Sequence, residues 1–462
     1  MSTPTSSTPD WLGVHEALER ILSRVQPLQT ERIAADQALG HTLAAEVRAR
    51  LDLPARDNAA MDGWAVHSDD LREATPAAPV RLQIAGRIAA GDPDPELLPR
   101  GSALRIMTGA PIPPGADAVI RVEDTNWQRF DGTPPSDPGQ VVFTAPCAPS
   151  TNVRPAAQDL RRDETVVERG TAFSAGVHAA VAAAGHAHVT VTRCPRVAIV
   201  PTGNELVDAA SLEEPSALEA AAQRGSTPDS NGPMLVDLVH AAGGDAQLQP
   251  IAPDTPHALR ETLSRALATD PDVLVTIGGV SMGDADHVRS TLSELGLTLE
   301  FWRVRMRPGS PLAFGRMPNG TLVLMLPGNP ASAFVTFHLF VRPLLRTLLG
   351  DNDPHLPVLQ ATAAQPLPST ARLCQFHRVV FDLTAPSSTA GASGAALPTV
   401  RLTGATGSGL VSGLATTQGL AVIPEGIDRL EAGMLVECVL IGTHGAGPGF
   451  GSRTPGYRAT TS

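Results

Sequence analysis

Residues 196–205 read RVAIVPTGNE, and this stretch decides the fold. Its four consecutive apolar residues, Val197 to Val200, predict a short strand that is buried on both faces, as in a parallel sheet. The strand ends in a loop of turn-forming and polar residues. Two later apolar runs end in loops of the same kind; with their loops they read VLVTIGGVSMGDAD (273–286) and TLVLMLPGNP (321–330).

Helix signals lie between these runs. Asn231 is expected to cap one helix, and Thr255-Pro256 opens another, because proline suits the first helical turn. A long apolar helix is expected from Pro330 onward, with a kink at Pro343. Strands that alternate with helices predict a central three-layer α/β domain with a mostly parallel sheet. Short β-rich runs on both sides of it predict further β domains, so the expected fold class is multidomain α/β plus β.

The composition excludes several classes of protein. Of the 462 residues, 42% are hydrophobic and 18% are charged, which is typical of globular rather than disordered chains. The net charge of −12 argues against a nucleic-acid partner, which needs a cationic surface. Because the sequence has neither a long apolar run nor the apolar core of a signal peptide, we expect a cytoplasmic protein with no membrane partner. The four cysteines lack C-x-x-C spacing, which argues against zinc and thioredoxin sites.

The loops at the strand ends are candidates for binding an anion. In an open α/β sheet, ligands bind outside the carboxyl ends of the strands, where glycines let the backbone approach and N–H groups donate hydrogen bonds. Glycine and proline also simply turn a chain, and for one loop alone that explanation would be preferred. Three such loops at one sheet edge favour an anion site.

Three acids, Glu205, Asp254 and Asp286, follow the predicted strand ends. Two carboxylates at about 4 Å repel each other by about 4 kcal/mol, and a hard cation such as Mg²⁺ relieves that repulsion. Acids near helix starts are often caps, an alternative that applies to Asp254. Arg303 and Arg307 are candidates for gripping a phosphate or another oxyanion, the alternative being surface ion pairs of little energy. Together these residues suggest phosphoryl or anhydride chemistry.

Six motifs follow one another along the chain. They are DNAAMDGWAV (57–66), RIMTGAP (105–111), PTGNEL (201–206), GGVSMGDAD (278–286), RPGSP (307–311) and LPGNPAS (326–332). In this order they closely resemble the molybdopterin molybdenumtransferases, the family of bacterial MoeA and the gephyrin E domain. The resemblance extends over nearly the whole chain.

The resemblance implies an enzyme that inserts molybdate into adenylylated molybdopterin in the presence of Mg²⁺, releasing AMP and the molybdenum cofactor. It implies elongated homodimers of four-domain subunits, with an active site between the α/β domain of one subunit and the small β-rich domain of the other. The expected partners are the small-molecule substrates, a second copy of the chain, the molybdopterin adenylyltransferase and the acceptor molybdoenzymes. Two alternatives remain: adenylylation of molybdopterin by ATP, and a non-catalytic dimeric scaffold that binds a protein partner.

The resemblance also divides the chain into domains. We expect a linker and dimerisation domain at 11–48 and 152–190, a small β-rich domain at 49–151, a molybdopterin-binding α/β domain at 191–349, a C-terminal β domain at 350–442 and a disordered tail at 443–462. Insertions relative to the family fall at 131–139 and 386–398, where surface loops are expected.

The motif matches imply the site residues. The expected catalytic residues are Asp62, Glu205, Asp254, Asp286, Arg303 and Arg307. The expected residues for binding substrate or cofactor are Thr108, Gly203, Gly278, Gly279, Ser281, Gly283, Pro327, Pro330 and Ser408. The acids Glu205, Asp254 and Asp286 are also the expected Mg²⁺ ligands, and Asp159 matches a further acid of the family.

The chain departs from the family at its cations. It contains no lysine, so all 35 cationic residues are arginine. Arg303 and Arg307 stand where the family usually has lysine, which keeps the charge but changes the geometry, because a guanidinium is a planar fork and an ammonium is a point charge. Ser310 replaces a third lysine and removes one cation from the expected oxyanion site.

Overall fold

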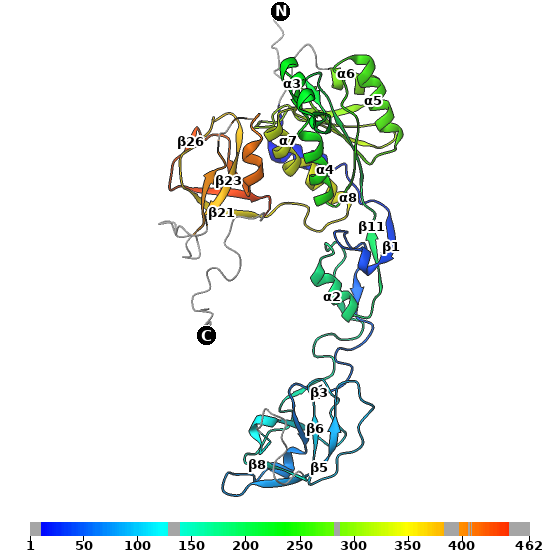
Figure 1. Ribbon diagram of the computed structural model, residues 1–462, viewed down its shortest axis with the longest axis vertical. Helices are drawn as coiled ribbons and strands as arrows, with labels where there is room; N and C mark the ends of the chain where they lie inside the picture. Colours follow the sequence, from blue (N-terminus) through cyan, green and yellow to red (C-terminus); the bar gives the residue numbers. More distant parts are fainter. Residues whose placement is uncertain are drawn as a thin grey trace, which may run out of the picture. The chain divides into compact units, whose positions relative to one another are not determined.

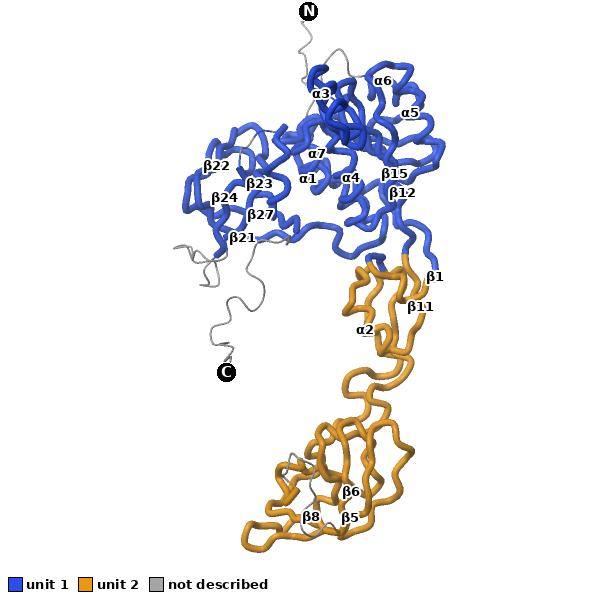
Figure 2. The backbone as a smooth tube through the Cα atoms, viewed as in Figure 1, with its two compact units in different colours: residues 1–31, 40–42, 192–462 blue, residues 32–39, 43–191 orange. Residues whose placement is uncertain are grey.

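The chain forms two compact units, coloured separately in Figure 2. The computed structural model describes residues 11–127, 139–280, 287–382, 397–404, 407 and 409–442. The first unit contains the residues up to Glu31, residues 40–42 and the residues from Thr192 onward. The second unit contains residues 32–39 and 43–191. The four domains predicted from the sequence divide the chain more finely than this, and their boundaries remain a prediction.

A six-stranded sheet forms the centre of the first unit (Figure 1). Its strands, in spatial order, are β15 (Asp245–Leu248), β12 (Arg196–Pro201), β16 (Val273–Ile277), β20 (Leu322–Leu326), β19 (Ala313–Arg316) and β17 (Thr298–Trp302). The first four strands run parallel to one another. Strand β19 pairs antiparallel with both β20 and β17, so β17 points the same way as the parallel strands.

Both faces of this sheet are covered, because successive side chains of a strand point to opposite faces. In β16, Val273, Val275 and Ile277 enter a core with helix α4 (Asn231–Ala241). Leu274 enters a second core with helices α5 (Pro256–Ala268) and α6 (His287–Glu294). Complete burial of each such apolar side chain contributes about 1.5–3 kcal/mol, which explains why every residue of β16 except Thr276 is apolar.

The long helix after β20 is irregular before its proline. It consists of α7 (Pro330–Thr336), a π-helical segment η5 (Phe337–Val341) and α8 (Arg342–Leu348). Pro343 has no N–H to donate to the carbonyl one turn earlier, so the regular hydrogen-bond ladder is interrupted there. The predicted kink at Pro343 therefore takes the form of a π-helical turn in the preceding residues.

A closed β-barrel follows in the same unit. Its strands are β21 (Val358–Ala363), β23 (Cys374–Asp382), β24 (Thr399–Leu402), β25 (Gly419–Ile423) and β27 (Leu435–Leu440). Each of these strands pairs with two others of the set, and the β23–β25 pairing closes the ring. Strand β18 (Met306–Arg307), which belongs to the segment after β17, pairs with β23 and so attaches the barrel to the α/β region.

The second unit is built mainly from strands. Its five-stranded sheet has the order β7 (Ala118–Arg121), β4 (Gly63–Val66), β6 (Ser102–Ile106), β5 (Val80–Ile88) and β8 (Gln140–Phe143). The remaining regular elements of its described residues include the paired strands β3 (Asn58–Ala59) and β9 (Val153–Arg154), the paired strands β2 (Val47–Arg48) and β10 (Thr165–Val167), and helix α2 (Ala175–Ala183).

Short elements complete the described residues. They are α1 (Val14–Leu22), β1 (Thr30–Ala34), η1 (Ala35–Gln37), η2 (Ser68–Leu71), η3 (Val122–Asp124), β11 (His188–Thr192), β13 (Leu206–Val207), η4 (Ala209–Leu212), α3 (Pro215–Arg224), β14 (Thr227–Pro228), β22 (Leu367–Pro368), η6 (Ser412–Thr416) and β26 (Arg429–Leu430). None of the helices in the described residues has both the length and the apolar character that crossing a membrane requires.

The helix start predicted at Thr255-Pro256 is confirmed, and the cap predicted at Asn231 is wrong. The Thr255 hydroxyl accepts a hydrogen bond from the Ala258 N–H at 3.4 Å and caps α5. Helix α4, in contrast, begins with Asn231, and the carboxylate of Asp229 accepts from the N–H groups of Asn231 and Gly232, both at 3.0 Å. The charged acceptor two residues earlier takes the capping role and leaves the Asn231 side chain for another contact.

Burial of His338 in the π-helical segment predicts a pH-dependent stability. Burial, together with the positive charge of Arg342, lowers the pKa of His338 from 6.5 to about 3. Below pH 6.5 the His338 imidazole is protonated in the unfolded chain but stays neutral in the folded one. The free energy of unfolding therefore falls as the pH drops. At pH 5 this amounts to about 2 kcal/mol relative to pH 7. We expect His338→Leu to reduce the stability loss between pH 7 and pH 5 by about that amount, measured by chemical denaturation.

The matched control is His257→Leu, at an exposed position of α5. Equal pH dependence in the wild type and the His338 variant would contradict the assignment.

Candidate active site

Three loops meet at the carboxyl edge of the parallel sheet. The strands β12, β16 and β20 end in register, since Pro201 pairs with Ile277 and Ile277 pairs with Leu326. Beyond this row, the N–H and the hydroxyl of Thr202 both donate to the Ile277 carbonyl at 3.0 Å. The N–H of Gly278 donates to the Leu326 carbonyl, also at 3.0 Å. The predicted convergence of the glycine loops at one edge is therefore present.

The loops approach so closely that side chains are excluded. Gly278 has a φ of +91°, and a Cβ placed on it would lie 2.8 Å from the Thr202 hydroxyl oxygen. A Cβ on the neighbouring Gly279 would lie 2.2 Å from Val288 of α6. In the third loop, a Cβ placed on Gly328 would lie 3.5 Å from the Cα of Gly278. Gly278 and Gly279 leave no room for a Cβ, and together with Gly328 they expose backbone at the edge of the sheet.

Two of the three expected metal ligands are described, and they come from adjacent loops. The N–H of Asn204 donates to the Asp254 carboxylate at 3.2 Å, and the N–H of Asp254 donates to the Asn204 side-chain oxygen at 3.0 Å. This reciprocal pair brings Asp254 beside Glu205, the next residue after Asn204. Because Thr255 caps α5, Asp254 is not the helix cap. The Glu205 carboxylate packs against Gly203. A Cβ placed on Gly203 would lie only 2.7 Å from Oε2 of Glu205.

Carboxylate oxygens are the ligands that Mg²⁺ prefers, so the donors of Glu205 and Asp254 suit that ion. The third expected ligand, Asp286, lies outside the described residues, as do Ser281, Gly283 and Ser408. Within the described ranges no group of three or more His, Cys, Asp or Glu side chains is arranged to hold a metal ion. The complete Mg²⁺ site thus stays a prediction.

The third loop, which contains Pro327 and Pro330, is fixed by Asn231, the residue whose sequence pattern predicts a helix cap. The side-chain amide of Asn231 donates to the Gly328 carbonyl at 2.7 Å, while its side-chain oxygen is buried without a hydrogen bond to any described residue. Asn231 is 6% exposed. The local sequence Ser230-Asn231-Gly232 gives no signal of this contact, which depends on a loop almost 100 residues away.

Gly407 and Leu410, on either side of Ser408, are bound by the barrel strand β23. Arg378 of β23, which is buried, donates to the carbonyl oxygens of Leu410 at 2.9 Å and Gly407 at 3.4 Å. A Cβ on Gly409 would lie 3.9 Å from the side-chain oxygen of Asn329. Gly409, the residue after Ser408, therefore lies near Asn329 of the PGNP loop, and the expected role of Ser408 stays a prediction.

The two expected oxyanion-binding arginines differ in their surroundings. Arg303 follows the carboxyl end of β17, at the same edge as the three loops, with a φ of +79° and its guanidinium over the rings of Trp302 and Trp11. Arg307 is exposed on β18, and its charge helps to lower the pKa of His377, after the larger effect of burial. The Ser310 hydroxyl donates to the Val304 carbonyl at 3.0 Å, so it has a structural contact in place of the missing cation.

A second group of site residues lies in the second unit. The Asp62 carboxylate accepts hydrogen bonds from the hydroxyl of Thr108 at 2.7 Å and from its N–H at 2.8 Å. These bonds, with the nearby charge of Arg105, lower the pKa of Asp62. Gly63 is required beside it, because a Cβ there would lie 2.1 Å from the Ile120 carbonyl oxygen of β7. The structure thus joins two motifs that are more than 40 residues apart.

The first motif of this unit also contacts its returning chain. Asp57 accepts a hydrogen bond from the N–H of Ala156 at 2.8 Å, and Asn58 pairs with Arg154. The side-chain oxygen of Asn58 is buried with no partner among the described residues. Asp159 is exposed, and its N–H donates to the Leu53 carbonyl at 2.9 Å.

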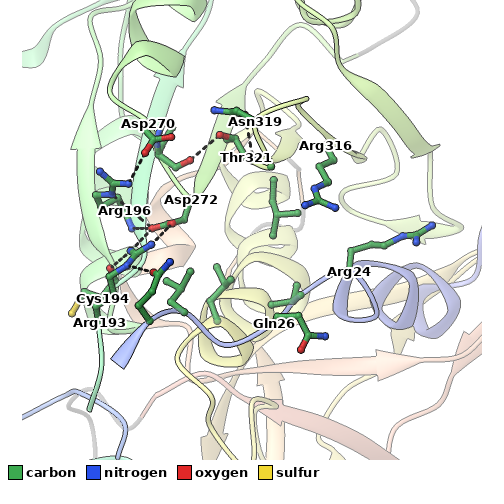
Figure 3. Close-up of a pocket in the computed structure, with 17 residues that line it drawn as sticks. Arg24, Gln26, Arg193, Cys194, Arg196, Asp270, Asp272, Arg316, Asn319 and Thr321 are labelled. Atoms are coloured by element: carbon green, nitrogen blue, oxygen red, sulfur yellow. Dashed lines mark hydrogen bonds and ion pairs between the residues drawn. The ribbon is translucent and has the colours of Figure 1, made fainter. Parts of the chain in front are cut away.

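A cavity of about 920 Å³ opens at the amino edge of the same sheet, away from every expected site residue (Figure 3). Arg193 and Asp272 form a bidentate ion pair there, with both N···O distances at 2.7 Å, and Arg196 pairs with Asp270 at 3.1 Å. These charges compensate one another and tie strand starts together. The cavity was not predicted from the sequence, and ion pairs account for the polar lining formed by Arg193, Arg196, Asp270 and Asp272.

Family models match almost all of the chain. The model described as "MoeA N-terminal region (domain I and II)" matches residues 12–185, that of a "Probable molybdopterin binding domain" matches 198–347, and that of the "MoeA C-terminal region (domain IV)" matches 360–441. The chain belongs to the MoeA family. The family predicted from the six motifs is confirmed, and with it an enzyme of the molybdopterin molybdenumtransferase type that acts in molybdenum cofactor biosynthesis.

Individual relatives of this MoeA-family chain agree. "Molybdopterin molybdenumtransferase 2" of Mycobacterium tuberculosis is 35% identical over 402 residues, which are 86% of this chain and 91% of that protein. "Molybdopterin molybdenumtransferase" of Nostoc sp. is 36% identical over 75% of this chain and 76% of that protein. The crystal structure of the molybdopterin biosynthesis moeA protein from Pyrococcus horikoshii OT3 superposes with a TM-score of 0.77 at 25% identity, covering 94% of this chain and 100% of that one.

The contact between loops in this MoeA-family protein predicts the effect of a single methyl group. Gly278→Ala adds a Cβ that collides with Thr202 in a left-handed backbone. Gly225→Ala, the matched control in the same unit, is also left-handed, with a φ of +68°, but nothing lies within 4 Å of its Cβ. We expect the control to lose about 1 kcal/mol of unfolding free energy and Gly278→Ala to lose a further 1–3 kcal/mol or so. Equal losses in denaturant titrations would show that the loops do not meet as described.

Proposed function

We propose that this enzyme inserts molybdate into adenylylated molybdopterin and releases AMP, using Mg²⁺ at the carboxyl edge of its α/β sheet. The observation that carries the proposal is the meeting of three glycine loops beside Asp254 and Glu205. Such an edge offers backbone N–H groups to phosphate and carboxylates to a metal ion, which are the two needs of a pyrophosphate-linked substrate.

Glu205, Asp254 and Asp286 are the proposed ligands of Mg²⁺. When bound, the ion supplies positive charge to the pyrophosphate link of the substrate as the P–O bond breaks. Gly203, Gly278, Gly279, Ser281 and Gly283 belong to the two loops that would carry phosphate against their backbone. Without side chains at the glycines, a phosphate oxygen reaches the N–H groups directly.

The segment 303–310 is proposed to hold molybdate. Arg303 and Arg307 present guanidinium groups, which bind tetrahedral oxyanions through charge-assisted hydrogen bonds of about 1.5–3 kcal/mol each. Both follow β17, whose carboxyl end lies at the edge where the loops meet. Pro327, Pro330 and Ser408 are proposed to contact the substrate from the PGNP loop and from the barrel segment beside it.

Asp62 and Thr108 are proposed to act on a second copy of the chain. In a homodimer of the kind that the family resemblance implies, the small domain of one subunit would complete the site of the other. The lowered pKa of Asp62 supports a role as an anion, because its two hydrogen bonds from Thr108 favour the ionised carboxylate. The domain boundaries expected from the sequence, with a discontinuous linker and dimerisation domain at 11–48 and 152–190, belong to this proposal.

Release of AMP from adenylylated molybdopterin tests the proposed reaction. The purified protein with molybdate and Mg²⁺ is expected to release AMP without consuming ATP. Glu205→Gln keeps the shape of the side chain and removes the charge that would bind the metal, so we expect AMP release to fall by about two orders of magnitude, the usual scale for loss of a key electrostatic group. The matched control is Glu213→Gln, an exposed glutamate in the same unit, with unchanged activity expected.

Three outcomes would contradict the proposal. Full AMP release by Glu205→Gln would show that the Glu205 carboxylate does not belong to the site. Consumption of ATP with molybdopterin would indicate the adenylyltransferase. An intact dimer with no turnover would indicate a scaffold.

A further inference from the structure

The Arg303 guanidinium lies within stacking distance of two tryptophan rings. Its Cζ is 4.2 Å from the ring centroid of Trp302 and 5.0 Å from that of Trp11. These distances are within the range of cation–π attraction, which is stronger for tryptophan than for other aromatic side chains. Arg303 is half-buried, so the attraction is less screened than at a fully exposed position.

Each ring is held in place from elsewhere in the fold. The indole N–H of Trp302 donates to the carbonyl of Val280, in the glycine loop after β16, at 3.2 Å. The Trp11 backbone lies along the segment after β17, where Leu12 bridges Val304 and the Arg305 side chain donates to the Trp11 carbonyl. The N–H of Arg305 also donates to the Leu12 carbonyl, at 2.8 Å. The guanidinium thus lies against its sequence neighbour Trp302 and against Trp11 from a distant part of the chain.

Stacking engages the face of a guanidinium and leaves its edge free. The N–H donors of arginine lie in the plane of the group, so they point away from a ring that covers its face. Among the described residues, no carboxylate lies within ion-pair distance of Arg303 and no hydrogen bond of its side chain is formed. The group is thus oriented without using the donors that an oxyanion needs.

We propose that Trp302 and Trp11 are positioning residues that hold Arg303 with its N–H edge presented to molybdate. This inference rests on the proposed function, because it assigns the oxyanion to Arg303. It also accounts for arginine where the family usually has lysine, since a planar cation stacks on an indole and keeps several coplanar donors, whereas an ammonium offers neither property. Ser310 supplies no cation, so the orientation of Arg303 carries more of the binding.

The test is the steady-state response to molybdate at saturating adenylylated molybdopterin and Mg²⁺. Trp302→Leu removes the stacking ring and is expected to raise the KM for molybdate about tenfold. The KM for adenylylated molybdopterin and kcat should stay within about twofold, because saturating molybdate restores the orientation of Arg303. Trp302→Phe lacks the N–H but keeps an aromatic face, so it should recover most of the molybdate affinity. Trp11→Leu is expected to act in the same direction with a smaller effect, in line with its longer distance.

Two controls separate positioning from general damage. Trp127→Leu removes a half-buried tryptophan from the second unit. Arg289→Leu removes the other guanidinium that stacks on Trp302, also at 4.2 Å, and leaves Arg303 in place. Both should leave the KM for molybdate within about twofold of wild type.

Arg303→Ala distinguishes failure of this inference from failure of the proposed function. If Arg303→Ala loses molybdate affinity but both tryptophan variants match the wild type, the positioning role is wrong and the proposed function stands. If Arg303→Ala also keeps the wild-type KM, the arginine does not bind molybdate. A parallel loss of kcat and of affinity for both substrates in Trp302→Leu, without recovery in Trp302→Phe, would indicate structural damage and overturn the inference.

Discussion

The candidate site depends on the close approach of glycine backbones at the carboxyl edge of the α/β sheet. A Cβ on Gly278 would collide with the Thr202 hydroxyl oxygen at 2.8 Å, whereas Gly328 packs on Gly278 at an ordinary van der Waals distance. Hydrogen bonds across the same row, from Thr202 to Ile277 and from Gly278 to Leu326, keep the loops in register. Because the strands end at one level, the residues that follow them lie at the same edge of the sheet. These residues are Glu205 after β12, Asp254 after β15, Arg303 after β17, and Pro327 and Pro330 after β20. Larger residues at the glycines would separate these groups.

Distant parts of the first unit complete that edge. The chain near Trp11 runs beside Val304, and strand β18 joins β23 of the barrel immediately afterwards. Arg378 of β23 then holds the segment on either side of residue 408, near Asn329. The segment proposed to bind the oxyanion therefore lies between the chain near Trp11 and the barrel, and both restrict its conformation. This arrangement explains how a loop with a left-handed arginine is maintained, since its neighbours on both sides are hydrogen-bonded.

The sequence predicted the features that depend on local pattern. The apolar runs at Val197, Val273 and Leu322 formed the central strands, and the glycine loops after them met as the topology of a parallel sheet requires. Motif resemblance named Asp62 and Thr108 separately as expected site residues, and the structure joins them by two hydrogen bonds. What escaped prediction depends on long-range contacts: Asn204 with Asp254, Asn231 with Gly328, and Trp11 with Arg303. Asn231 was assigned to a cap because local pattern cannot show that Asp229 would take that role. Pro343 signalled an irregular helix, but not that five residues before it would become π-helical.

Hydrogen–deuterium exchange of the homogeneous protein, with and without adenylylated molybdopterin and Mg²⁺, tests the location of the site most directly. Binding at the carboxyl edge predicts slower exchange in peptides covering 201–206, 278–280 and 326–330, and no change in those lining the cavity at the amino edge, such as 193–196 and 316–321. Protection confined to the amino-edge peptides would place the substrate at the opposite end of the sheet and contradict the account.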